Sequence, residues 1–198
     1  MTVPAAPALE RLADVAALDP RDLPTYTVLV PVYKEANVVA DLIANLGALD
    51  YPREKLEILL LLEENDTETI EAARAARPPS TITFLVVPPG HPQTKPKACN
   101  VGLEQATGEF VTIYDAEDIP DPLQLRRAVV ALRRLGSSYV CLQAELGYFN
   151  VDQNRITQWF ALEYATWFRS LLPGLVALLA GYALLPLPET ALRVLYSA

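Results

Sequence analysis

The chain has 198 residues, which is enough for one α/β domain with a sizeable core. It is 52% hydrophobic and 20% charged, a balance that excludes intrinsic disorder. Its net charge of −8 argues against a nucleic-acid partner, because binding to a phosphate backbone needs a basic face. One histidine and two cysteines also exclude the usual structural zinc sites.

The two cysteines and the N-terminus indicate a compartment. Cys99 and Cys141 both lie in apolar stretches, so we expect buried and reduced thiols. The first residues hold no basic segment followed by an apolar core, and the sequence therefore predicts no signal peptide. Together these features favour a cytoplasmic protein.

An alternation of strands and helices follows an N-terminal extension and linker over residues 1–24. Apolar, β-rich runs predict strands over residues 25–32, 56–62, 81–87, 110–114 and 139–144. Helical periodicity predicts the intervening helices over residues 38–46, 67–77, 98–105 and 125–132. Asn65 with Glu68 resembles a capping box at the start of the second of these helices. The order predicts an α/β fold with a mostly parallel, doubly wound, Rossmann-like sheet over residues 25–169.

The character of the chain changes after residue 150. Residues 156–168 form an aromatic helical pattern, which we interpret as core rather than as a ligand platform. Residues 170–188 carry no charge, but prolines and glycines interrupt them, so we expect no transmembrane helix. We treat residues 170–198 as a separate apolar segment that is either buried or in contact with a membrane surface.

Three acidic residues stand where the central strand ends. Asp115, Glu117 and Asp118 directly follow the apolar run 110–114, and ligands of open α/β sheets bind at this end of the strands. A divalent cation such as Mg²⁺ or Mn²⁺ would relieve their mutual repulsion and bridge to substrate phosphates. The alternative is a solvated acidic turn that caps the next helix, with Asp121 as its N-cap.

Other polar groups are expected at the same edge of the sheet. They follow the first strand at residues 33–35 and the second strand at residues 63–66, and they include Lys95, Lys97 and Asn100 at a helix start. Carboxylates, lysines and a helix N-terminus together predict a nucleotide-diphosphate site. Neither a G-x-G-x-x-G motif after the first strand nor a G-x-x-x-x-G-K-[ST] motif is present.

Four segments, taken together, resemble the family 2 glycosyltransferases, inverting enzymes that share the glycosyltransferase-A fold with cellulose synthase and many exopolysaccharide synthases. VLVPVYKE resembles the opening strand of the family, and LLLLEENDTET resembles its second strand with an acidic pair. KPKACNVGLEQATGEF resembles the K-A-x-N-x-G segment, and YDAEDIPDP resembles the metal-binding D-x-D motif. The resemblance covers residues 25–168 and implies a glycosyltransferase-A nucleotide-diphospho-sugar transferase.

The resemblance also implies roles for individual residues and a reaction. The implied donor-site residues are Pro31, Tyr33 and Glu35 beside the nucleotide, Asp66 with its neighbour Glu64 at the base or ribose, Lys97 at the diphosphate, and Asn100, which fixes a turn. Asp115 and Glu117 would bind Mg²⁺ or Mn²⁺ against the diphosphate. The implied reaction is an inverting transfer from a nucleotide-diphosphate sugar, expected to be UDP-linked, to a saccharide or lipid acceptor at the inner face of the cell membrane.

The sequence departs from the family pattern downstream. We find neither the E-D or T-E-D motif that supplies the general base nor the Q-x-x-R-W motif of processive members. No catalytic residue is therefore assigned, and the chain resembles the donor-binding part of a truncated enzyme. The alternative function is a donor-binding remnant without transfer activity. A metal-dependent nucleotidyltransferase is disfavoured because VPVYKEAN holds no glycine.

Overall fold

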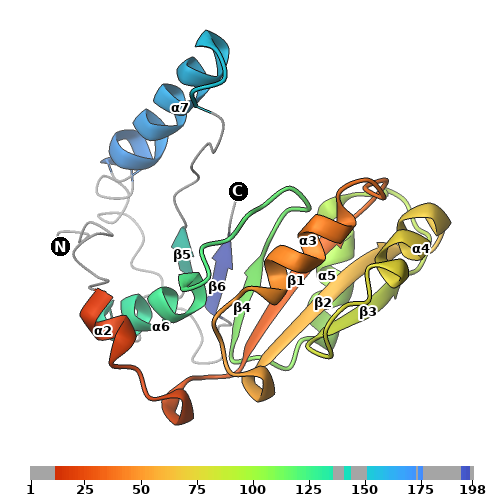
Figure 1. Cartoon of the computed structure of the whole chain (residues 1–198), viewed down its shortest axis with the longest axis horizontal. Helices are drawn as coiled ribbons and strands as arrows, with labels where there is room; N and C mark the ends of the chain where they lie inside the picture. The colour runs from red at the N-terminus through yellow and green to blue at the C-terminus, as the bar shows by residue number, and fades with distance from the viewer. Residues whose placement is uncertain (1–11, 136–140, 144–150, 173, 176–192, 197–198) are drawn as a thin grey trace.

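The sheet is parallel and its strands come from most of the length of the chain. The structure is a computed structural model and describes residues 12–135, 141–143, 151–172, 174–175 and 193–196. The strands are β1 (Tyr26–Val32), β2 (Leu56–Glu63), β3 (Ile82–Val87), β4 (Phe110–Ile113), β5 (Cys141–Gln143) and β6 (Arg193–Tyr196). They lie in the order β3-β2-β1-β4-β6-β5, and every pairing is parallel (Figure 1). The predicted parallel α/β sheet is confirmed.

The strand order reverses beside β1, which pairs with β2 on one side and with β4 on the other. Val32 at the end of β1 lies opposite Leu62, whereas β4 ends at Ile113, opposite Leu29. β1 and β2 therefore extend beyond β4 at their carboxyl ends. A crevice for ligands is expected at such a reversal point in an open α/β sheet.

Helices cover both faces of the sheet (Figure 1). α3 (Val39–Gly47), α4 (Thr67–Ala75) and α6 (Gln124–Leu135) contribute to the larger apolar core, which includes Val28 and Val30 of β1. α5 (Lys95–Gln105) contributes to the smaller core, which includes Leu29, the residue between those two valines. Because neighbouring strand residues point to opposite faces, this alternation shows the helices on two sides, as the doubly wound prediction requires.

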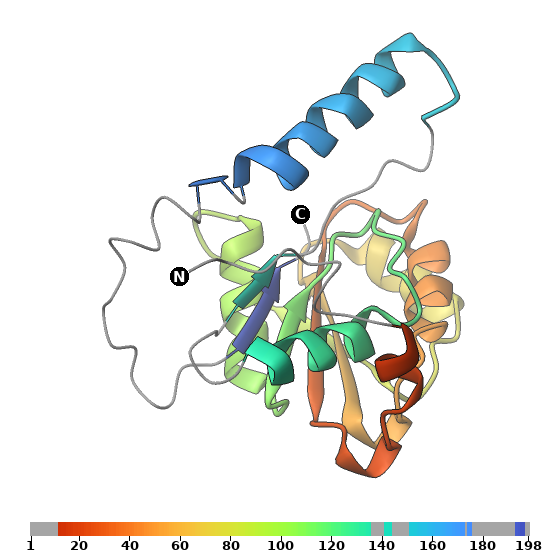
Figure 2. The same ribbon diagram turned by 90° about the vertical axis from the view of Figure 1, so that its left-hand side faces the viewer.

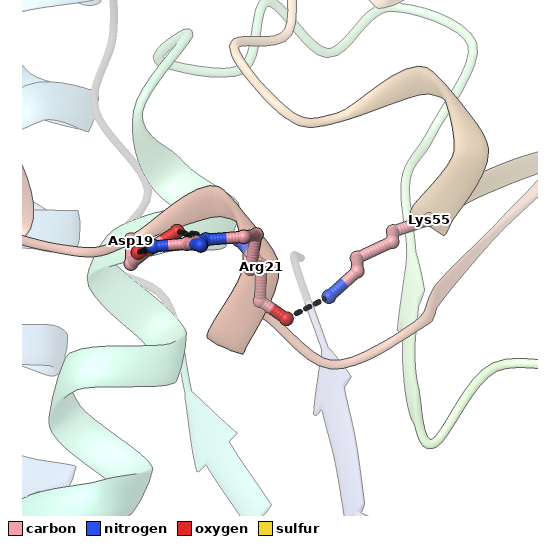
Figure 3. Close-up of polar contacts among 3 residues, drawn as sticks. All are labelled: Asp19, Arg21 and Lys55. Atoms are coloured by element: carbon pink, nitrogen blue, oxygen red, sulfur yellow. Dashed lines mark hydrogen bonds and ion pairs between the residues drawn. The ribbon is translucent and has the colours of Figure 1, made fainter.

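A lysine joins the segments that lead into β1 and β2, at the end of the sheet away from their carboxyl termini (Figure 3). The Nζ of Lys55, in the 3-10 helix η2 (Arg53–Lys55), donates to the carbonyls of Arg21 at 2.6 Å and Leu23 at 2.5 Å. Arg21, in η1 (Pro20–Asp22), also pairs with Asp19, but this pair is exposed to solvent and contributes little to stability. The backbone contacts of Lys55 fix where the two central strands begin.

The start of one helix, one additional strand and the exposure of one thiol differ from the sequence prediction. α5 begins at Lys95 rather than near residue 98, because Pro96 fits the first turn of a helix, where no backbone N–H is needed. Strand β6 was not expected, and it lies between β4 and β5 in the sheet. The expected burial of both cysteines is half right, since Cys99 is buried and Cys141 is exposed.

The aromatic segment is not core, which corrects the interpretation from the sequence. It forms α7 (Arg155–Thr166) and the π-helix η3 (Trp167–Leu171), and α7 has no buried residue. Trp159 is 73% exposed and Trp167 is 47% exposed. α2 (Leu12–Ala16) lies beside α6 and the other helices already described lie against the sheet, whereas α7 extends away from the sheet in both views (Figure 2). The helix is held locally by an Asn154–Thr157 capping box. In the part of the chain that the structure describes, no helix is long and apolar enough to cross a membrane.

The exposure of the aromatic helix predicts how strongly acrylamide quenches the tryptophan fluorescence of the protein. Trp159 and Trp167 are the only two tryptophans of the chain, so its tryptophan emission reports on this helix alone. Because both side chains are exposed, we expect acrylamide to quench the native protein nearly as strongly as the urea-unfolded protein. A native protein that is quenched several-fold less than the unfolded chain would show that another surface covers α7.

Candidate functional site

The polar residues singled out in the sequence gather at the carboxyl-terminal edge of the sheet. Lys34 follows β1, Asp66 follows β2 and Asp115 follows β4. The start of α5 belongs to the same edge, since Lys95 contacts Asp115. The residues with expected donor or metal roles are partly buried at Pro31, Glu35, Lys97 and Asp115, buried at Asp66, and exposed at Tyr33, Glu64, Asn100 and Glu117.

Asp66 connects the loops after β1 and β2. Its Oδ2 accepts a hydrogen bond of 2.5 Å from the backbone N–H of Lys34, and its Oδ1 accepts one of 3.3 Å from that of Thr69. Lys34 has a φ of 59°, a left-handed conformation that its N–H bond to Asp66 stabilises. Asp66 is also the N-cap of α4, so the predicted capping box on Asn65 is wrong by one residue. Asn65 instead accepts a 3.1 Å bond from Gln93.

The surroundings of Asp66 lower its pKa. Burial alone would raise the pKa of this carboxyl, but hydrogen bonds from the Lys34 and Thr69 backbones and from the Thr69 side chain outweigh it. Asp66 is therefore ionised at neutral pH. A charged, hydrogen-bonded carboxylate between two loops holds both of them in place.

The lowered pKa predicts how acid affects stability. A carboxyl whose pKa is lower in the folded state stabilises above its unfolded pKa of about 4 and loses that contribution as pH falls through the folded value. We expect the free energy of unfolding of the parent to fall more steeply below about pH 4 than that of Asp66→Asn, which cannot titrate. Urea denaturation between pH 2.5 and pH 7 measures this, and parallel curves for the two proteins would contradict the assignment.

A polar hollow lies beside Asp66 between the loops after β1 and β2. Its volume is about 420 Å³, within the range of about 300–1,000 Å³ that is common for ligand sites. It is lined by Lys34, Ala36, Asn37, Asn65, Asp66, Thr67, Glu68 and Thr69. The many hydrogen-bond donors and acceptors of this lining suit a polar, planar ligand such as a nucleobase.

Lys97 is held by a buried acid, Glu63, which the sequence places at this edge without an individual role. Its Nζ lies 3.3 Å from Oε2 of Glu63 and donates a 2.5 Å bond to the carbonyl of Pro88. The Glu63 side chain is 5% exposed, so its charge needs a partner. The signal for Glu63 was present in the sequence as a charged residue at the end of an apolar strand.

The acidic loop after β4 is ordered by its own members. The Asp118 carboxylate accepts a 2.8 Å bond from the backbone N–H of Asp115, and the Asp118 backbone N–H donates a 3.1 Å bond to the Asp115 carbonyl. The carboxylate of Asp115 forms an ion pair with Lys95, and Glu117 is exposed. Asp121 accepts a 2.8 Å bond from the backbone of Leu123, but α6 begins only at Gln124, so the predicted N-cap lies two residues ahead of the N-cap position.

The donor chemistry of this loop fits a hard divalent cation. In the described residues, no group of three or more His, Cys, Asp or Glu side chains could hold a metal by itself. Mg²⁺ and Mn²⁺ sites of phosphate-handling enzymes commonly use one or two carboxylates together with substrate phosphates. Asp115 already holds a cation, the ammonium of Lys95, so this carboxylate is placed for a positive charge.

The parallel sheet and the polar loops at its carboxyl ends agree with the glycosyltransferase-A fold that the sequence resembles. Residues 24–173 match the family described as "Glycosyltransferase like family 2". The match covers more than half of the chain, and the protein belongs to this family.

Individual relatives agree with that assignment. The glycosyltransferase AglE of Haloferax volcanii is 27% identical over 128 residues, which are 65% of this chain and 42% of AglE. The structure of the mannosyltransferase PcManGT from Pyrobaculum calidifontis, in complex with GDP-Man and Mn²⁺, is 30% identical with a TM-score of 0.55, and the likeness covers 67% of this chain and 38% of PcManGT.

A third likeness concerns the fold alone. The structure of residues 1–349 of TarS from Staphylococcus aureus, in complex with UDP-GlcNAc, is 22% identical with a TM-score of 0.51, and the likeness covers 63% of this chain and 35% of that fragment. The chain spans less than half the length of the curated relatives it matches.

Two side chains connect the segments that carry the predicted residues. Asp66 connects the loops after β1 and β2, and Lys95 connects α5 to the loop after β4. Tyr33 packs under the Nζ of Lys34, 5.1 Å from the ring centroid. Glu63 and Lys95 are contacting residues whose individual roles the sequence did not indicate.

Proposed function

We propose that the chain binds a nucleotide-diphosphate sugar at the carboxyl-terminal edge of its sheet and transfers the sugar to a saccharide or lipid acceptor. The observation that carries the proposal is the convergence of four polar segments on this edge, tied together by Asp66, Lys95 and Lys97. The donor proposed is UDP-linked. The GDP-Man bound to PcManGT supports a nucleotide-sugar donor as a class, and the Mn²⁺ bound there supports a divalent metal.

Each part of the donor has a proposed position. The base lies in the hollow beside Asp66, where Pro31, Tyr33, Glu35 and Glu64 border the loops. The diphosphate lies toward the first turn of α5, because the partial positive charge at a helix N-terminus favours an anion. Lys97 and Asn100 belong to this helix, and Lys97 reaches the phosphates only by leaving Glu63.

Asp115 and Glu117 are proposed to hold Mg²⁺ or Mn²⁺, which neutralises the charge that builds on the departing nucleoside diphosphate. The protein itself orients the donor through the two loops that Asp66 joins. Inversion requires a general base on the face of the sugar opposite the diphosphate. Among the described residues, no contact singles out a candidate for this base, and the catalytic residue is left unassigned.

An activity assay tests the proposal. The purified chain is incubated with UDP-hexoses or GDP-mannose, Mn²⁺ and oligosaccharide or lipid acceptors, and the released nucleoside diphosphate is measured by chromatography. We expect release from a UDP-sugar that depends on Mn²⁺ and rises with an acceptor. Binding of the donor without any release in the presence of acceptors would favour the donor-binding remnant. Release that is equal in EDTA would contradict the metal-dependent reaction.

A further inference from the structure

Two lysines stand two residues apart in the first turn of α5 and contact different acids. Lys95 pairs with Asp115 after β4, and Lys97 pairs with Glu63 at the end of β2. Residues two apart on a helix point to different sides. One turn of α5 therefore places one ammonium beside the loop after β4 and the other at the end of β2. Lys97 is also bound to the Pro88 carbonyl at 2.5 Å. Lys95 therefore neutralises an acid of the loop after β4, whereas Lys97 neutralises a buried acid of β2.

The Lys95 contact occupies the carboxylate that the proposed metal needs. The ammonium lies on Oδ1 of Asp115, and the two side chains are 32% and 34% exposed. The Asp118 carboxylate also holds the loop, because it accepts the 2.8 Å bond from the backbone N–H of Asp115. The contact that Lys95 adds is a positive charge on the Asp115 carboxylate.

We propose that Lys95 is a built-in counter-ion of Asp115 that competes with the divalent metal for this carboxylate. The inference rests on the proposed metal role of Asp115. In the absence of donor, the ammonium neutralises Asp115. A metal that arrives with a nucleotide diphosphate displaces it, because a divalent ion that also binds phosphate oxygens gains more from the carboxylate than one ammonium does.

The competition has a measurable size. Pairs of this exposure contribute up to about 1 kcal/mol, which is about a fivefold change in a binding constant. Removing the ammonium should therefore tighten the binding of Mn²⁺ alone by about two- to fivefold. Removing a different positive charge at this edge should not tighten Mn²⁺ binding. Lys95 contacts Asp115 directly, whereas Lys97 contacts Glu63.

The test measures Mn²⁺ binding without nucleotide, by the loss of the free-ion electron paramagnetic resonance signal, up to millimolar Mn²⁺. The variants are Lys95→Gln, Lys95→Arg and Lys34→Gln. Lys34→Gln removes the same charge from the loop after β1, where the side chain lies over the Tyr33 ring. We expect Lys95→Gln to bind Mn²⁺ about two- to fivefold more tightly than the parent, and the other two to bind like the parent.

The outcomes separate this inference from the proposed function. If Lys95→Gln binds Mn²⁺ as weakly as the parent, or if Lys34→Gln tightens binding equally, the competition is overturned. Asp115→Asn is measured alongside, and parent-like binding by this variant would overturn both the competition and the metal assignment. If no variant binds Mn²⁺ up to millimolar concentrations, the competition is overturned, whereas UDP binding still decides the donor site separately.

Discussion

Replacing Asp115 with asparagine should remove metal-dependent donor binding while leaving the fold intact. The carboxylate is the proposed ligand that directly follows β4, and the neutral amide is a much weaker ligand for a hard cation. We expect the affinity for UDP in the presence of Mn²⁺ to fall at least about 100-fold, or about 2.7 kcal/mol. The fold should persist, because the backbone bonds between Asp115 and Asp118 do not use the Asp115 carboxylate.

Asp121→Asn is the matched control for this prediction. Asp121 lies in the same loop and is exposed, and its oxygen accepts from the Leu123 backbone, a bond that asparagine retains. Calorimetric titration of UDP into both variants, with thermal denaturation beside it, separates binding from folding. UDP affinity of Asp115→Asn equal to that of the parent with Mn²⁺ present would show that the metal assignment is wrong.

Replacing Lys97 with methionine should destabilise the protein strongly. The Glu63 side chain is 5% exposed, and the described residues offer it Lys97 as its charged partner, 3.3 Å away. Breaking a buried ion pair from one side leaves an uncompensated charge, which costs about 3–5 kcal/mol. We expect a loss of about 3 kcal/mol in the free energy of unfolding, at the lower end, because Lys97 is itself 22% exposed.

The double variant Glu63→Gln/Lys97→Met distinguishes the cause. With the buried charge removed as well, most of the lost stability should return, which urea denaturation of the single and double variants measures. If Lys97 acts only on the donor diphosphate, Lys97→Met loses UDP affinity without losing stability, and the double variant gains nothing back. That result would contradict the structural role of the Glu63 pair.

The sheet and the location of the site could be predicted because they depend on local patterns. Apolar runs such as 56–62 fix the strands, and alternation with helices fixes their parallel order. The edge at Asp66 and Asp115 follows from the same order, since ligands gather where parallel strands end.

Contacts between distant segments could not be predicted. Strand β6 (Arg193–Tyr196) is short and pairs with β4, which lies far earlier in the chain, so no local pattern marks it. The division between Lys95 and Lys97 depends on which strand each side of α5 faces, and the sequence shows only two lysines in one turn. The aromatic residues of α7 resemble core residues in sequence because hydrophobicity does not show whether a partner surface is present.

The central claim is that the carboxyl-terminal edge of this sheet binds a nucleoside diphosphate together with a metal. Calorimetric titration of UDP into the purified chain, once with Mn²⁺ and once with EDTA, tests it most directly. We expect saturable binding with Mn²⁺ and at least about 100-fold weaker binding, about 2.7 kcal/mol, in EDTA. Absence of UDP binding under both conditions would contradict the donor site, and equal affinity under both would contradict the role of the metal.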